Sequence, residues 1–222
     1  MRVERFSGTG AEWDTFVRAQ AGWTHFHQYG WRSVMEDALG HETLLFVARD
    51  GRDQLTGVLP LVRVKSLLVG HFLISMPFLN YGGPLGNDAA IRALADRAVE
   101  QANESGADLI ELRCRSELQL DMPASHRKVT VALEIEPGDP EPTFKALKSK
   151  VRSQVRRPTK EGVEVRFGAD QLGAFYRVFA ENMRDLGTPV LGEPIFRAMR
   201  DTFGESVWVG TAWLDGAPVA AG

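Results

Sequence analysis

The chain has 222 residues, of which 44% are hydrophobic and 25% charged, and its formal net charge is −3 at pH 7. This composition is typical of a globular protein with one large or two small domains. The negative charge argues against a general nucleic-acid binder. The single cysteine, Cys114, excludes an intramolecular disulfide and a multi-cysteine metal site.

The sequence predicts a cytoplasmic protein. Residues 1–6 lack the apolar core of a signal peptide. The most apolar stretch, residues 66–79, is interrupted by Gly70, His71 and Pro77. It therefore falls short of the roughly 20 apolar residues that span a bilayer, and we expect no transmembrane segment.

Residues 1–135 predict a complete domain of helices and strands. Apolar residues at helical spacing, such as Trp13, Phe16 and Val17, indicate helices, and apolar runs on either side of Asp50-Gly51 indicate a hairpin. The expected elements, in chain order, are helix 13–21, helix 28–39, strand 43–48, strand 55–64, strand 71–76, a glycine loop at 80–86, a long helix capped by Asp88 and ended by Gly106, strand 108–114 and strand 128–134.

Residues 136–142, rich in proline and glycine, predict a linker. The elements expected after it are a basic helix over 143–157 that Pro158 stops, strand 163–167, helix 171–186, helix 194–203, strand 207–214, a turn at Asp215-Gly216 and strand 217–222. This repeats the helix, helix, strand, Asp-Gly, strand order of residues 1–135. Because the repeat ends within its second strand, we expect the second domain to be truncated at Gly222.

The repeated order is typical of an N-acyltransferase domain, in which two helices, antiparallel strands, a glycine loop, a helix and a strand follow one another. The predicted fold class is α+β, with tandem GNAT-like domains of which the second is truncated. We expect domain 1 over residues 1–135, the linker over 136–142, and the basic helix with the start of domain 2 over 143–222.

A basic segment is the first candidate site. Residues 145–160 hold seven basic residues and no acidic one, whereas residues 1–140 hold 14 basic and 19 acidic residues, a net charge of −5. Guanidinium and ammonium groups bind phosphate, so this segment predicts an anionic ligand. A solvated surface helix paired with acidic groups of the first domain is the alternative. The candidate anion-binding residues are Lys148, Lys150, Arg152, Arg156, Arg157 and Lys160.

Three further segments are candidates for a substrate cleft. The backbone N–H groups of Tyr81, Gly82 and Gly83 could cradle an anion, although a tight strand-to-helix turn explains the glycines equally well. His25 and His27 lack a third metal ligand, so capping and packing are favoured there over a metal site. The remaining candidates for the cleft are His27, Gln28, Asn182 and Asp185.

Four separated segments, in order, resemble the FemAB-related proteins, and most closely the subgroup associated with exosortase and PEP-CTERM sorting systems of Gram-negative bacteria. They are residues 26–31 (FHQYGW), 75–85 (SMPFLNYGGPL), 154–162 (QVRRPTKEG) and 182–189 (NMRDLGTP). The resemblance implies tandem acyltransferase-like domains without a metal. It also implies that the loop at Gly82-Gly83-Pro84 lines the acceptor cleft. Fem aminoacyltransferases move an amino acid from aminoacyl-tRNA to an amine of a peptidoglycan precursor.

The resemblance predicts a transferase that moves an acyl or aminoacyl group to an amine of an anionic cell-envelope or exopolysaccharide-related acceptor. The acceptor would be a small molecule or lipid-linked, with peripheral contact to the inner membrane. We expect no bound cofactor; charged tRNA or acyl-CoA would be the acyl donor. Two alternatives stay open: a non-catalytic GNAT-like module that binds an anionic glycan precursor or RNA, and a basic helix that serves only as a structural brace.

Overall fold

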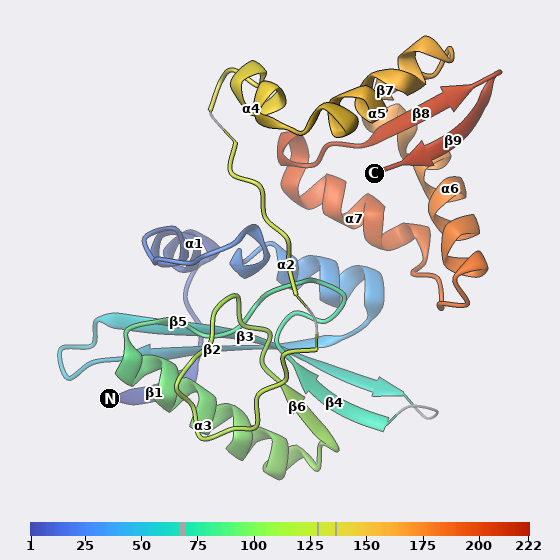
Figure 1. Cartoon of the computed structure of the whole chain (residues 1–222). Helices are drawn as coiled ribbons and strands as arrows, with labels where there is room; N and C mark the ends of the chain where they lie inside the picture. The colour runs from blue at the N-terminus through green and yellow to red at the C-terminus, as the bar shows by residue number, and fades with distance from the viewer. Residues whose placement is uncertain (67–69, 128, 136) are drawn as a thin grey trace. The chain divides into compact units, whose positions relative to one another are not determined.

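The computed structural model describes residues 1–66, 70–127, 129–135 and 137–222 (Figure 1). Its contacts divide the chain into two compact units. Unit 1 comprises Met1–Asp121 and Pro194–Gly204, and unit 2 comprises Met122–Glu193 and Glu205–Gly222. The expected division into residues 1–135 and 143–222 remains a prediction.

Unit 1 is built on a mixed sheet with the strand order β1-β2-β3-β4-β6, and β5 also pairs with β3. Neighbouring strands are antiparallel except β4 and β6, which are parallel. The strands are β1 (Arg2–Arg5), β2 (Glu42–Arg49), β3 (Leu55–Ser66), β4 (Gly70–Ile74), β5 (Leu85–Gly86) and β6 (Leu109–Glu111).

Helices cover both faces of this sheet. On one face, Phe46 and Leu59 pack with Leu94 of α3 (Asp88–Ser105). On the other, Val47 packs with Trp13 of α1 (Gly10–Arg18). Because successive side chains of a strand point to opposite faces, β2 is a continuous apolar run rather than an alternating one.

The remaining helical elements of unit 1 lie between α1 and β2, and late in the chain. They are the 3₁₀-helix η1 (His25–His27), α2 (Trp31–Ser33), the π-helix η2 (Val34–Ala38) and α7 (Glu193–Phe203). The ring of Phe203 packs against His25 and Trp31, with ring centroids 4.6 Å and 5.0 Å apart. These contacts join a helix from the end of the chain to unit 1.

Unit 2 contains a three-stranded antiparallel sheet in the order β7-β8-β9, on which α6 packs. Its helices are α4 (Glu141–Ala146), α5 (Ser149–Lys160), the 3₁₀-helix η3 (Ala169–Gln171) and α6 (Leu172–Asp185). Its strands are β7 (Glu164–Phe167), β8 (Gly210–Leu214) and β9 (Ala217–Ala221); the 3₁₀-helix η4 (Gly204–Ser206) precedes β8.

The element order confirms the expected α+β class, and four local predictions are wrong. The basic segment is two helices, because Leu147 and Lys148 are extended, and Pro158 lies inside α5 rather than ending it. The long helix is capped by Asn87, whose side chain accepts the N–H of Ala90. The helix expected over 28–39 starts at Trp31 and becomes a π-helix.

The fourth wrong prediction is the strand over 128–134. Lys128 lies outside the described residues, and residues 129–134 are irregular and exposed. Their alternating apolar pattern has no neighbouring strand in the described part of the chain to pair with. Strand β1, in contrast, was not predicted, because its sequence of Arg2, Val3, Glu4 and Arg5 offers only one apolar residue.

Candidate functional site

The glycine loop after β4 is held by the chain that follows β6. The N–H groups of Gly82 and Gly83 both donate to the carbonyl oxygen of Arg113, at 3.1 Å and 2.9 Å. An N–H that already has a strong acceptor is not available to an anion. The anion cradle expected from these two N–H groups is therefore not formed in this conformation, and the tight turn is.

Close packing explains why these two residues are glycine. A Cβ atom on Gly82 would lie 2.5 Å from Cγ of Met76, and one on Gly83 would lie 2.7 Å from Sγ of Cys114 and 3.1 Å from the oxygen of Arg113. Neither glycine has a positive φ. Their role is to let the backbone approach its neighbours closely.

The segment between β4 and the glycine loop is strained and firmly anchored. Met76 and Phe78 have φ angles of +53° and +67°, which are costly for residues other than glycine. Ser75 Oγ accepts the N–H of Arg113 at 2.7 Å, and Arg113 Nη1 donates to the carbonyl of Leu79 at 2.7 Å. Backbone strain of this kind persists only where the surroundings enforce it.

His27 contacts the glycine loop at the carbonyl of Gly83, whereas Arg113 contacts its N–H groups. His27 is 3% exposed, with Nε2 3.1 Å from the carbonyl oxygen of Gly83 and Nδ1 3.1 Å from the backbone nitrogen of Thr24. Burial lowers the pKa of His27 below its usual value of 6.5, so the neutral ring is favoured. Capping and packing, rather than metal binding, therefore describe His27, and it lies too deep to contact a substrate directly.

The other two unit 1 candidates are partly accessible. Gln28 is half-buried, and its Oε1 accepts a hydrogen bond of 2.9 Å from Arg18. Tyr81 is also half-buried, and its ring centroid lies 6.5 Å from that of Phe26. The structure thus brings His27, Gln28 and the glycine loop together from segments more than 50 residues apart in sequence.

The basic candidates of unit 2 fall into two groups: three arginines whose side chains contact other residues, and three lysines. Arg152 Nη1 donates to the carbonyls of Lys145, at 3.0 Å, and Leu147, so it caps the end of α4. Arg156 lies over the ring of Phe144, 5.0 Å from its centroid. Arg157 pairs with Glu161 at 2.7 Å, which raises the arginine's pKa. These three arginines have structural partners as well as charge.

The three lysine candidates differ from the arginines. Lys148, Lys150 and Lys160 are exposed, and no hydrogen bond or ion pair between their ammonium groups and another described residue is found. An ammonium group without a side-chain partner in the protein can pair with a bound anion. They are therefore the strongest anion-binding candidates of the segment.

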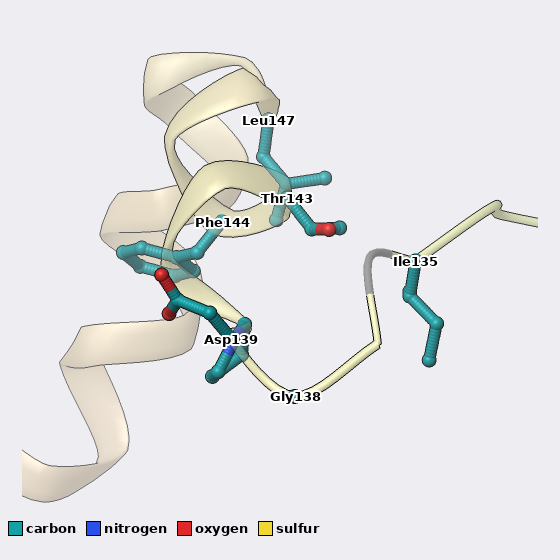
Figure 2. A pocket seen from close by; sticks show the side chains of 7 residues that line it. Ile135, Gly138, Asp139, Thr143, Phe144 and Leu147 are labelled. Atoms are coloured by element: carbon teal, nitrogen blue, oxygen red, sulfur yellow. The ribbon is translucent and has the colours of Figure 1, made fainter.

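An apolar hollow beside α4 was not predicted. It has a volume of about 420 Å³ and is lined by Ile135, Gly138, Asp139, Pro140, Thr143, Phe144 and Leu147. In Figure 2 the side chain of Phe144 comes from α4, that of Leu147 from the residue directly after this helix, and that of Ile135 from the chain before it. Asp139 accepts the N–H of Glu141, the first residue of α4, at 3.0 Å. The hollow neighbours the basic helix in sequence and is open to solvent.

The last two candidates lie at the exposed end of α6. Asn182 and Asp185 are both exposed, and Asp185 pairs with Arg184 at 2.9 Å. The candidate residues therefore form one group in unit 1, around the glycine loop, and two groups in unit 2, on α5 and at the end of α6.

The one cysteine of the chain lies beside the glycine loop. Cys114 is half-buried, and burial raises the pKa of its thiol to about 11. Only a small fraction is thiolate at neutral pH, so Cys114 is a poor nucleophile.

Among the described residues, no group of three or more histidine, cysteine or acidic side chains could hold a metal ion. The described helices include none long and apolar enough to cross a membrane.

Comparison with known proteins identifies the fold. No protein-family model and no curated protein matches the chain. The crystal structure of FemX is similar, with a TM-score of 0.55 and 18% sequence identity over 97% of this chain. The chain spans 58% of the FemX chain. A probable acetyltransferase is also similar over 61% of this chain and 99% of its own, with 16% identity and a TM-score of 0.38. The protein has a Fem-like, GNAT-type fold.

Proposed function

We propose that the protein is an acyltransferase that moves an acyl or aminoacyl group to an amine of an anionic acceptor. The observation that carries the proposal is the similarity of fold to FemX over 97% of the chain. The exposed lysines of α5 add a binding surface for the acceptor's negative charge. We also propose that the protein belongs to the subgroup associated with exosortase and PEP-CTERM systems. Its acceptor would be a precursor of the cell envelope or of an exopolysaccharide.

The reaction would be acyl transfer without a covalent enzyme intermediate. The acceptor amine attacks the carbonyl carbon of an activated ester or thioester, the new amide bond forms, and the donor's C–O or C–S bond breaks. The amine loses a proton, and the leaving oxygen or sulfur takes one up. The high pKa of Cys114 disfavours an acyl-cysteine route. Positioning of the two substrates would then supply much of the rate.

A mass-spectrometric transfer assay tests the proposal. The purified protein is incubated with charged tRNA or acyl-CoA and with amine acceptors that carry a nucleoside diphosphate or a lipid diphosphate. We expect a protein-dependent mass gain of one acyl or aminoacyl group on the acceptor. Acceptor binding without any product, with both donors, would contradict the proposal and favour the non-catalytic binding module.

The lysines of α5 provide the variant for this assay. Replacement of Lys148, Lys150 and Lys160 by Gln should raise the acceptor KM about tenfold, as expected when binding energy of about 1.4 kcal/mol is lost. The matched control replaces three exposed arginines of unit 1 with the same loss of charge: Arg52→Gln, Arg92→Gln and Arg115→Gln. An equal change in both triple variants would show a general charge effect rather than a site on α5.

A further inference from the structure

We propose that His27 is a positioning residue, whose Nε2–H group holds the carbonyl of Gly83 and thereby fixes the conformation of the strained loop from Met76 to Gly83. The consequence for transfer rests on the proposed function and on the family resemblance, which implies that this loop lines the acceptor cleft. The structural part of the inference, concerning the tautomer and the loop, is independent of it.

The hydrogen-bond partners assign the tautomer. Gly83 offers a carbonyl oxygen, which can only accept, so Nε2 must carry the proton across the 3.1 Å contact. Thr24 offers its backbone N–H to Nδ1 at 3.1 Å, and this group can only donate. Its hydroxyl lies 2.9 Å from Nδ1 and can donate as well, whereas its carbonyl is more distant, at 3.4 Å. Nδ1 is therefore the acceptor, and the ring is neutral with its hydrogen on Nε2.

The loop needs to be held from both sides. Met76 and Phe78 adopt positive φ angles that non-glycine residues disfavour, and Phe78 remains 45% exposed, so its own burial offsets little of this cost. Arg113 binds the loop through the N–H groups of Gly82 and Gly83, and His27 binds it through the carbonyl of Gly83. If the His27 bond is lost, the loop can relax toward ordinary φ values.

Two amide variants separate the two halves of the ring. Asn at position 27 places an oxygen near Nδ1, where it can still accept from Thr24, but it does not reach Gly83. Gln places an NH₂ group near Nε2, where it can still donate to Gly83, but it no longer accepts from Thr24. His27→Asn thus removes the loop contact and keeps the cap, and His27→Gln does the reverse.

Amide hydrogen exchange of Gly82 and Gly83 is the first measurement, because it does not depend on activity. We expect roughly five- to tenfold faster exchange in His27→Asn, as for the loss of one neutral hydrogen bond, and nearly unchanged exchange in His27→Gln. Faster exchange in His27→Gln but not in His27→Asn would overturn the proposal. The contact with Thr24, rather than the contact with Gly83, would then hold the loop. Exchange in β2 and β3 reports whether each variant is folded.

The wild-type protein offers a test without a variant. Long-range ¹H–¹⁵N correlations of the His27 ring should show a neutral imidazole protonated on Nε2. A hydrogen on Nδ1 would overturn the assignment even if both variants failed to fold.

The transfer assay then separates this inference from the proposed function. In His27→Asn the acceptor KM should rise while kcat is retained, and His27→Gln should restore the wild-type KM. If the exchange results are as expected but the wild-type protein transfers nothing, the proposed function fails and the role of His27 in the loop stands. If transfer occurs and the acceptor KM is the same in all three proteins, the loop does not position the acceptor and the proposal fails.

Discussion

Each of the two sheets of this protein contains an antiparallel hairpin of two strands joined by a turn. The sheets differ in the number of faces that helices cover. In unit 1, neighbouring residues of β2 are buried on opposite faces, as with Phe46 under α3 and Val47 under α1. In unit 2, Thr211 is buried on the face that carries α6 and Gln171. Phe167, on the opposite face, is 66% exposed within the described part of the chain.

The difference shows that a hairpin and a core have different causes. The hairpin forms from local turn chemistry, which both sheets possess. Burial of a face requires a helix from elsewhere in the chain, such as α3, whose small residue Ala90 packs close to Gly57 of β3. An apolar strand residue is thus a core residue only where such a helix reaches it.

The largest expected effect tests this contrast directly. Phe46→Ala, at a residue 1% exposed, should destabilise unit 1 by about 3–5 kcal/mol, because a large buried side chain leaves a cavity. Phe167→Ala should change the stability of unit 2 by about 0.5 kcal/mol or less. Urea unfolding followed by circular dichroism, with hydrogen exchange to assign the unit affected, measures both. Similar losses in the two variants would mean that the face bearing Phe167 is covered in solution.

The second effect concerns pH and is expected in unit 1. Burial lowers the pKa of His25, His27 and His41 below 6.5, so the unfolded chain binds more protons than the folded one under mildly acidic conditions. Stability should therefore be complete above about pH 6.5 and should fall as the pH drops from there toward the folded-state pKa values. Urea unfolding at a series of pH values measures this loss.

His27→Gln is the matched variant for the pH effect, since it keeps a donor to Gly83 and cannot titrate. Its stability should decline less between pH 6.5 and pH 5 than that of the wild-type protein. A variant with an unchanged pH profile would assign the acid sensitivity to other groups.

The sequence predicted most elements, because apolar periodicity and turn residues are local signals. The helices ending at Gly40 and Gly106 end there as expected, with both glycines at positive φ. The site was less predictable, because its contacts are long-range. Nothing near His27 in sequence indicates Gly83, which lies 56 residues away. Likewise, the sequence predicts Arg152 as an anion ligand, and its hydrogen bonds to the carbonyls of Lys145 and Leu147 could not be predicted because they depend on the break between α4 and α5.

The two Asp-Gly turns provide the finest comparison and the smallest expected effect. At Asp215-Gly216 both residues have positive φ, 51° and 78°, as in the type I′ turn of a two-residue hairpin. At Asp50-Gly51 the loop is longer: Asp50 Oδ1 accepts the N–H groups of Arg52 and Gln54, and Asp53 has the positive φ instead. The same dipeptide therefore serves two different turns.

Replacing each glycine by alanine should distinguish these turns. Gly216→Ala should cost about 1 kcal/mol, because an alanine at φ +78° is strained although its Cβ would meet no atom within 4 Å. Gly51→Ala, without a positive φ and equally open, should be nearly neutral. Hydrogen exchange at the strand ends next to each turn measures the local change. Equal losses at both positions would show that Gly51 also needs the left-handed conformation in solution, and the two hairpins would then share one turn type.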